Sequence, residues 1–298
     1  MFKNWNRKTP MKRWPLKTLR RDWQRWALTI SRNGNCSAAR RLLCLPLLFV
    51  GGLSWAWDTL PHQRITRAAL DILPKRHLDR FGSELQSLSE IYSILPDRYV
   101  EMVHYGFVRK SPGPQNVAEI RVYCVRPDGQ PVHGATGDRE SDTVSLVFLL
   151  ERIAASLAKK RAGEASRYAG VLAHFVEDSL SPPHAVDADV LLEMTPKGPG
   201  IKRINVHSVI ERSVPDFALS GRSPRALGGD LLAAATVILD QCYEGAAANK
   251  RDLPSMVKAA AHGNEQVLNE YRLRAGKRAA EILADALYTV FRSSDEAR

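Results

Sequence analysis

Apolar residues recur at helical spacing along most of the chain after residue 57. In residues 62–73 they fall at Ile65, Ala68, Ala69 and Ile72, as on one face of an amphipathic helix. The same periodicity predicts helices over residues 84–94, 142–160, 164–180, 204–213, 226–243, 254–261 and 264–292. Several boundaries are set by prolines, which cannot continue a helix interior. The pattern predicts an all-α fold, a single-domain multi-helix bundle.

One stretch departs from this spacing. Residues 119–126 (EIRVYCVR) alternate as in a strand, and the Pro127-Asp128-Gly129 sequence after them is typical of a turn. We therefore expect an irregular excursion at about 106–140 within the helical domain.

Composition divides the chain near residue 57. The net charge of +11 belongs to residues 1–56, which hold twelve Lys and Arg and a single acid, whereas the remaining residues hold 31 basic and 31 acidic side chains. All six tryptophans also fall at or before Trp57. A neutral domain over residues 57–298 lacks the basic stripe expected of a dedicated nucleic-acid-binding surface.

The segment before this boundary has the features of a signal peptide. Arg40 and Arg41 precede the apolar run 42–53, and Ser54-Trp55-Ala56 places small residues at the −3 and −1 positions. The run is shorter than the roughly 20 residues that span a bilayer. We expect a basic N-terminal extension and signal peptide over 1–56, cleavage at about 56/57, and a secreted or periplasmic protein that begins at Trp57.

Cysteine usage excludes thiolate metal sites. Cys124 and Cys242 remain after cleavage, and no CxxC pattern occurs. Export permits a disulfide between these two residues, and two buried thiols are the alternative. A metal site would have to be built from His, Asp and Glu.

Histidines and acids recur at ligand spacing in two places. His174 and Asp178 are four residues apart on a predicted helix, so both face one side, and Pro182-Pro183 then turns His184 back toward them. His207 and Glu211 repeat the four-residue spacing on another predicted helix. Each pair alone is typical of two solvated side chains one helical turn apart, but the two pairs together with His184 favour metal binding.

The pattern HFxxDxxxPxHA followed by HSxxE resembles the zinc-dependent phospholipase C and single-strand-specific nuclease superfamily. The resemblance implies an all-helical fold with three zinc ions, one of them bound by the amino group and carbonyl oxygen of an N-terminal tryptophan. The independently argued cleavage leaves Trp57 in that place, and His62 follows five residues later.

Carried over residue by residue, the resemblance implies three ligand sets. Trp57, His62 and Asp178 hold one zinc. Asp97, His104, His174 and Asp178 hold a second, which makes Asp178 the bridge. His184, His207 and Glu211 hold the third. Asp97 and Asp178 are the carboxylates expected to serve catalysis.

This donor set suits the implied chemistry. Imidazole and carboxylate are ordinary zinc ligands. Three zinc ions bring six positive charges, whereas Asp97, Asp178 and Glu211 bring only three negative ones. The remaining positive charge favours the binding of a phosphodiester anion. Paired zinc ions lower the pKa of a shared water from 15.7 toward about 7 and clamp the attacking and leaving oxygens. The expected reaction is phosphoester hydrolysis.

Three features depart from the family pattern, and three histidines are not part of it. Asp97 and His104 are closer together than in the family, Glu177 occupies a position usually held by glycine, and Asp187 stands where the phospholipases tend to have asparagine. His77, His133 and His262 are expected to be structural or solvated.

Three functions follow from the ligand set: a secreted phospholipase C, a single-strand nuclease or 3′-nucleotidase, and a zinc-binding protein without turnover. Glu211 resembles the phospholipases, since the fungal nucleases tend to use aspartate there. The short gap from Trp57 to His62 and the long stretch from His184 to His207 are nuclease-like. We expect a monomeric phospholipase C-type enzyme with transient membrane-surface contact.

Overall fold

The computed structural model describes residues 59–106, 113, 116–196 and 204–296. These residues are mostly helical and contain no strand, which confirms the all-α prediction. Their order is α2 Thr59–Asp71, α3 Lys75–Leu78, η2 Asp79–Glu84, α4 Leu85–Glu90, η3 Tyr92–Ile94, α5 Leu95–Tyr105, α6 Val117–Cys124, α7 Arg139–Ala158, α8 Ala162–Ser179, η4 Pro182–Ala185, α9 Ala188–Met194, α10 Val206–Glu211, α11 Leu231–Ala261 and α12 Glu265–Glu296.

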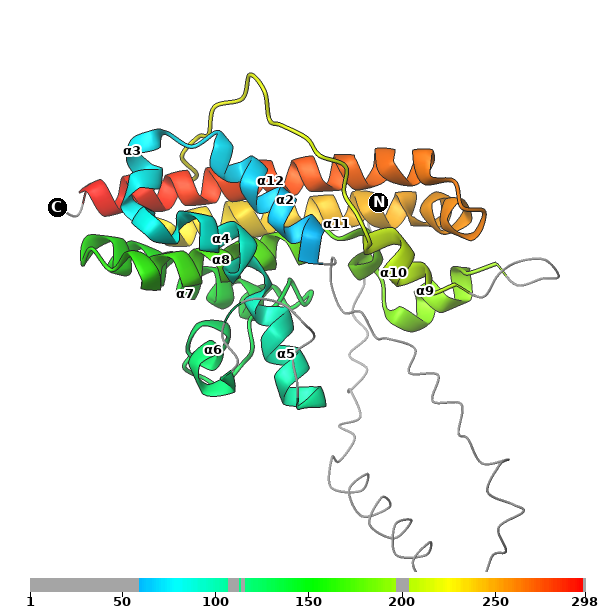
Figure 1. The fold of residues 1–298 in the computed structure, drawn as a ribbon, viewed down its shortest axis with the longest axis horizontal. Coiled ribbons are helices and arrows are strands. Elements are labelled where there is room, and N and C mark those ends of the chain that lie inside the picture. The colour runs from blue at the N-terminus through cyan, green and yellow to red at the C-terminus, as the bar shows by residue number, and fades with distance from the viewer. Residues whose placement is uncertain (1–58, 107–112, 114–115, 197–203, 297–298) are drawn as a thin grey trace, which may run out of the picture. The chain divides into compact units, whose positions relative to one another are not determined.

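Four long helices form the framework. Helices α7, α8, α11 and α12 pack against one another, while α2 lies on α12 and α8 (Figure 1). Capping side chains start two of them: Asp138 accepts from the backbone N–H groups of Glu140 and Ser141 at α7, and Asp230 from that of Ala233 at α11.

Helix α8 lies at the centre of the bundle. Apart from Arg167, all its residues from Ala165 to Ser179 are buried, as expected for a helix surrounded by others. It contacts the helices α2, α7, α11 and α12 as well as η2, η3, α4, α5 and α6. The polar residues at its C-terminal end are therefore enclosed by the fold.

The predicted strand over 119–126 is wrong. Residues 117–124 form helix α6, capped by the Asn116 side chain, which accepts from the N–H of Ala118. Ile120 and Cys124, one helical turn apart, are fully buried, whereas Val122 between them is 59% exposed. The turn after it is present at Pro127-Asp128, with Gly129 at φ 84°.

Two other boundaries differ from the sequence prediction. Helix α11 continues through Pro254 rather than dividing into two helices. The expected helix over 84–94 is instead α4 followed by the 3-10 turn η3, with Ile91 at φ −125° between them. Cys124 and Cys242 are both buried free thiols.

Two features of the N-terminal segment lie outside the described residues, the predicted signal peptide and Trp57. Among the residues that the structure does describe, no helix combines the length and hydropathy needed to cross a bilayer.

Gly170 allows α8 to approach η3 closely. A Cβ at this position would lie 2.4 Å from both the backbone carbon and the Cβ of Tyr92, far inside van der Waals contact. Gly170 precedes His174 by one turn, so this approach sets the distance between α8 and the segment that leads into α5.

We expect Gly170→Ala to lower the free energy of unfolding by about 1–3 kcal/mol, because the backbone of η3 must move. Gly229→Ala is the control, since a Cβ there meets nothing within 4 Å. Urea denaturation of both variants measures the difference. Equal stability of the two variants would contradict the close-packing argument.

Candidate metal centre

Two residues at the end of α8 begin the site. His174 and Asp178 are one turn apart and buried, at 0% and 1% exposure. His174 Nε2 lies 3.1 Å from Asp178 Oδ2. The four-residue spacing therefore places both side chains on one face of α8, as the sequence predicts.

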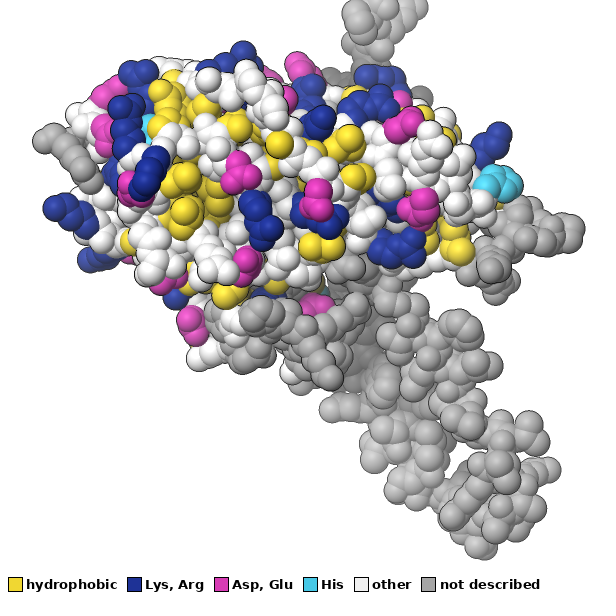
Figure 2. All heavy atoms as spheres, turned by 45° about the horizontal axis from the view of Figure 1, so that its top comes forward, with side chains coloured by type: hydrophobic (Ala, Val, Ile, Leu, Met, Phe, Trp, Pro, Cys, Tyr) yellow, Lys and Arg dark blue, Asp and Glu magenta, His cyan; other side chains and the backbone are white. Residues whose placement is uncertain are grey.

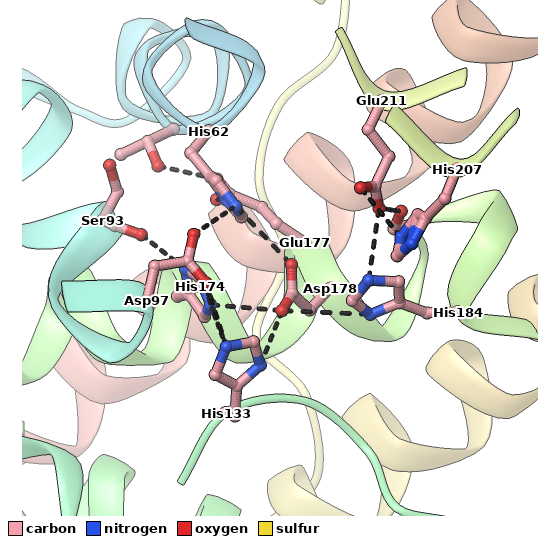
Figure 3. A network of polar contacts seen from close by, with 12 residues as sticks. His62, Ser93, Asp97, His133, His174, Glu177, Asp178, His184, His207 and Glu211 are labelled. Carbon is pink, nitrogen blue, oxygen red and sulfur yellow. Dashed lines mark hydrogen bonds and ion pairs between the residues drawn. The ribbon is translucent and has the colours of Figure 1, made fainter. Parts of the chain in front are cut away.

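Asp97 from α5 and His133 from the loop before α7 complete the first group (Figure 3). One ligand atom from each of Asp97, His133, His174 and Asp178 lies within 4.8 Å of the others. His133 Nε2 is 3.0 Å from Asp97 Oδ1, and its Nδ1 is 2.7 Å from Asp178 Oδ2. Ligand atoms around a tetrahedral zinc ion are about 3.4 Å apart, from bond lengths near 2.1 Å. With Nε2 as the one ligand atom of His133, its distances of 3.0 Å to Asp97 Oδ1 and 3.4 Å to His174 Nε2 are close to that spacing.

His62 from α2 lies on the opposite side of the same two carboxylates. Its Nε2 is 3.5 Å from Asp178 Oδ1 and 3.9 Å from Asp97 Oδ2. Its ring stacks on that of His174, with centroids 4.4 Å apart. Each carboxylate thus presents one oxygen to His62 and the other to His133 and His174, which is the arrangement of a bridging carboxylate.

The ring of His174 is oriented by backbone. Its Nδ1 lies 2.8 Å from the carbonyl oxygen of Ser93 in η3, so Nδ1–H donates and Nε2 is left toward Asp97 and Asp178. A ligating histidine usually has such a partner on its second nitrogen.

A second group contains His184, His207 and Glu211. Glu211 Oε1 is 3.2 Å from His184 Nε2, and Oε2 is 2.9 Å from His207 Nε2. Ser181 donates to Glu211 Oε1 at 2.6 Å and holds the carboxylate in place. His184 also reaches the first group, since its Nδ1 lies 4.0 Å from Asp178 Oδ2.

The electrostatics of the site follow from its acids. Burial opposes ionisation of Asp178, but the neighbouring His174 and His133 outweigh it and hold the pKa of this carboxyl well below its usual range. Burial also opposes protonation of the imidazoles, yet Glu177 raises the pKa of His62 to about 9, and Asp178 with Asp97 raises that of His133 to about 10. The site attracts positive charge.

Several buried atoms of the site have no hydrogen-bond partner in the described part of the chain. They are His62 Nε2, both oxygens of Asp178, His207 Nε2 and Glu211 Oε2. They face one another in pairs, with His62 Nε2 3.5 Å from Asp178 Oδ1 and His207 Nε2 2.9 Å from Glu211 Oε2. Buried polar groups normally have partners, and imidazole with carboxylate is the donor set of zinc. These clusters could hold metal ions.

The placement of His104 differs from the predicted ligand set. It is exposed and belongs to neither group. Asp97 and His104 both lie on α5, where seven residues span roughly 10 Å along the axis, so the two side chains cannot meet one ion. His133 takes the place beside Asp97. Pro96 at the start of α5 and Gly106 at its C-cap, with φ 72°, are the sequence signals of this helix that could have excluded His104.

The loop that carries His133 is fixed by long-range contacts. The N–H of Ala135 donates to Ser179 Oγ at 2.8 Å, and the N–H of Thr136 donates to the buried Asp142 of α7 at 2.9 Å. A Cβ at Gly134 would lie 3.0 Å from that of Asp178, so the loop passes directly over α8. The expected irregular excursion contains helix α6, and the loop after this helix brings a ligand-type histidine that we expected to be structural.

The other predicted site residues lie as follows. His62, Asp97, His174, Asp178, His184, His207 and Glu211 all meet in the site, and Trp57 lies outside the described residues. His77 is buried and stacks on Phe291, and His262 is exposed at the C-cap of α11. No protein-family model matches the chain, and no curated protein or solved structure is significantly similar to it.

We expect His133→Ala to reduce zinc binding by about one ion per chain, because Asp97 and Asp178 lose the imidazole between them. His104→Ala is the matched control and should bind as much zinc as the unchanged protein. Elemental analysis after dialysis measures both. The reverse result, with loss on His104→Ala alone, would contradict the geometry.

Proposed function

We propose that the protein is a zinc-dependent phosphodiesterase of the phospholipase C type. The observation that carries this proposal is the position of Asp178, whose two oxygens face imidazoles on opposite sides. A carboxylate shared by two cation sites is the feature that a two-metal phosphoester hydrolase requires. The resemblance of HFxxDxxxPxHA and HSxxE to the phospholipase C and nuclease superfamily supports the same proposal.

The residues divide among three ions in this proposal. His62 and Asp178 would hold one together with Trp57; Asp97, His133, His174 and Asp178 would hold the second; His184, His207 and Glu211 would hold the third. Zinc bound there would lower the pKa of a coordinated water and neutralise the charge of a phosphoryl group.

The exposure of these side chains indicates where substrate arrives. His62, His174, Asp178 and Glu211 are almost fully buried, whereas the side chains of Asp97, His133, His184 and His207 are 22–26% exposed. The four exposed residues form the rim that solvent reaches. A phosphodiester meets the site at this rim.

Asp97 is our candidate for the proton acceptor. Burial opposes its ionisation, but His174 and His133 lower the pKa of the carboxyl, so it is ionised at neutral pH. It is also more exposed than Asp178. Asp97 can therefore accept a proton from the attacking water, while Asp178 remains a structural bridge.

A phospholipid is favoured over a nucleic acid by charge. Residues 57–298 hold 31 basic and 31 acidic side chains, and on the one face that Figure 2 shows, Lys and Arg are interspersed with Asp and Glu. A nucleic-acid groove normally tracks the phosphates with a basic stripe. Glu211, the carboxylate of the third set, also resembles the phospholipases. The nuclease alternative is favoured by the spacing of Trp57 to His62 and of His184 to His207.

Export belongs to the same proposal. A signal peptide over residues 1–56 would release the protein beyond the cytoplasmic membrane with Trp57 as its first residue, in reach of phospholipid. The enzyme would act as a monomer with transient contact to the membrane surface.

The test uses purified mature protein on phosphatidylcholine and on single-stranded DNA, with and without chelator. We expect release of phosphocholine, loss of turnover with chelator and its return with zinc. Cleavage of DNA alone would establish the nuclease alternative. Stable zinc binding without turnover of either substrate would identify a binding protein.

Asp178→Asn should abolish most hydrolysis, with a loss of about 100-fold or more, and remove up to two zinc ions. The amide keeps the size but loses the charge and one anionic oxygen. His184→Ala should remove about one ion, since His207 and Glu211 form a separate pair. Zinc content and turnover are measured together. Full zinc content and near-normal hydrolysis of Asp178→Asn would overturn the bridging role.

A further inference from the structure

Glu177 is a fully buried acid beside the metal centre that belongs to neither group of ligand-type residues. It precedes Asp178 on α8, and its side chain points to α2 (Figure 3). A buried carboxylate is costly unless it is paired and hydrogen-bonded. The contacts of the Glu177 carboxylate must therefore offset the cost of its burial.

Both oxygens of Glu177 contact α2. Oε2 lies 2.5 Å from His62 Nδ1, and Oε1 accepts from the hydroxyl of Thr66 at 2.7 Å. His62 and Thr66 are four residues apart, on one face of α2, and both are fully buried. The carboxylate is thus held from two sides, in a fixed position relative to the His62 ring.

This contact determines which nitrogen of His62 faces the site. Because Nδ1–H donates to Glu177, Nε2 is the nitrogen that faces Asp178 Oδ1 and Asp97 Oδ2. His62 Nε2 has no hydrogen-bond partner among the described residues. A carboxylate on the outer nitrogen fixes the tautomer of a ligating imidazole and raises its basicity.

We propose that Glu177 is a positioning residue of the metal centre, which orients the His62 ring through Nδ1 so that Nε2 binds a divalent cation beside Asp97 and Asp178. The proposal rests on metal binding at this site. His174, the other fully buried imidazole of the site, is oriented by the neutral carbonyl of Ser93, whereas His62 has the carboxylate of Glu177 as its outer partner.

The experiment compares Glu177→Ala and Glu177→Gln in the full chain. Glu177→Ala should weaken the binding of one zinc ion by about 10–100-fold. It should also change the visible spectrum of the cobalt-substituted protein, because the ring is no longer fixed. Glu177→Gln keeps an acceptor for Nδ1–H without the charge and should restore part of the affinity.

Asp285→Asn is the matched control. Asp285, on α12, is also a buried carboxylate. Its Oδ2 lies 2.9 Å from the guanidinium of Arg222, and it contacts none of the ligand-type residues. This variant should lose stability and keep both the zinc affinity and the cobalt spectrum. A purely structural role of Glu177 would make its variants behave in the same way.

A second readout does not depend on turnover or on the alanine variant. Long-range proton–nitrogen NMR of Glu177→Gln and the unchanged protein, both metal-free and at a pH above the pKa of about 9 of His62, where the ring is neutral, reports which nitrogen carries the proton. We expect Nδ1–H in the unchanged protein and a partial loss of that preference in the variant. The positioning role is overturned if zinc affinity, cobalt spectrum and tautomer are all unaffected.

The outcome is separable from that of the proposed function. If the unchanged protein binds no zinc, the proposed function and the positioning role fall together. If it binds zinc and hydrolyses phospholipid while both Glu177 variants bind zinc equally well, only the positioning role falls.

Discussion

The buried carboxylate of Asp178 is the constraint on which the site depends. Four imidazoles from four parts of the chain lie within 4.0 Å of its oxygens: His62 on α2, His133 in the loop before α7, His174 on α8 and His184 in η4. Removing one partner from a buried charge typically costs several kcal/mol. The elements that carry the imidazoles must therefore hold their places around α8, and the packing of the bundle serves that requirement.

The sequence predicted the helices well where burial follows a single face. For α2, α7, α8 and α12 the apolar spacing was sufficient, because local periodicity and tertiary packing agree. For residues 119–126 they disagree. Alternation would place Ile120, Val122 and Cys124 on one face, but the structure buries Ile120 and Cys124 and exposes Val122. The short apolar run fits the periodicity of a strand as well as that of a helix, and its packing against α5 and α8 favours the helix.

The site was predictable where both ligands lie on one element. His174 with Asp178 and His207 with Glu211 follow from helical spacing, and the proline turn before His184 returns it to them. His133 could not be found in this way. Its position depends on hydrogen bonds from its loop to Ser179 and Asp142, residues that sequence distance does not connect to it. The family resemblance instead placed His104 beside Asp97, but the length of α5 carries it away from Asp97.

Charge balance explains how an acid-rich centre can be enclosed in this bundle. Asp97, Glu177, Asp178 and Glu211 face five imidazoles, and the carboxylates raise the pKa values of His62 and His133 although burial opposes this. Protons and divalent cations compete for such nitrogens, since a ligating imidazole must give up its proton. The imidazoles that neutralise the acids in the protein alone are therefore the ones that a metal would take over. Glu177 differs from the other three acids because its oxygens contact α2 through His62 and Thr66 rather than the shared space between the ligands. Because Glu177 lies outside that shared space, it can hold the ring of His62 in one orientation while the charge on the other side of the ring changes.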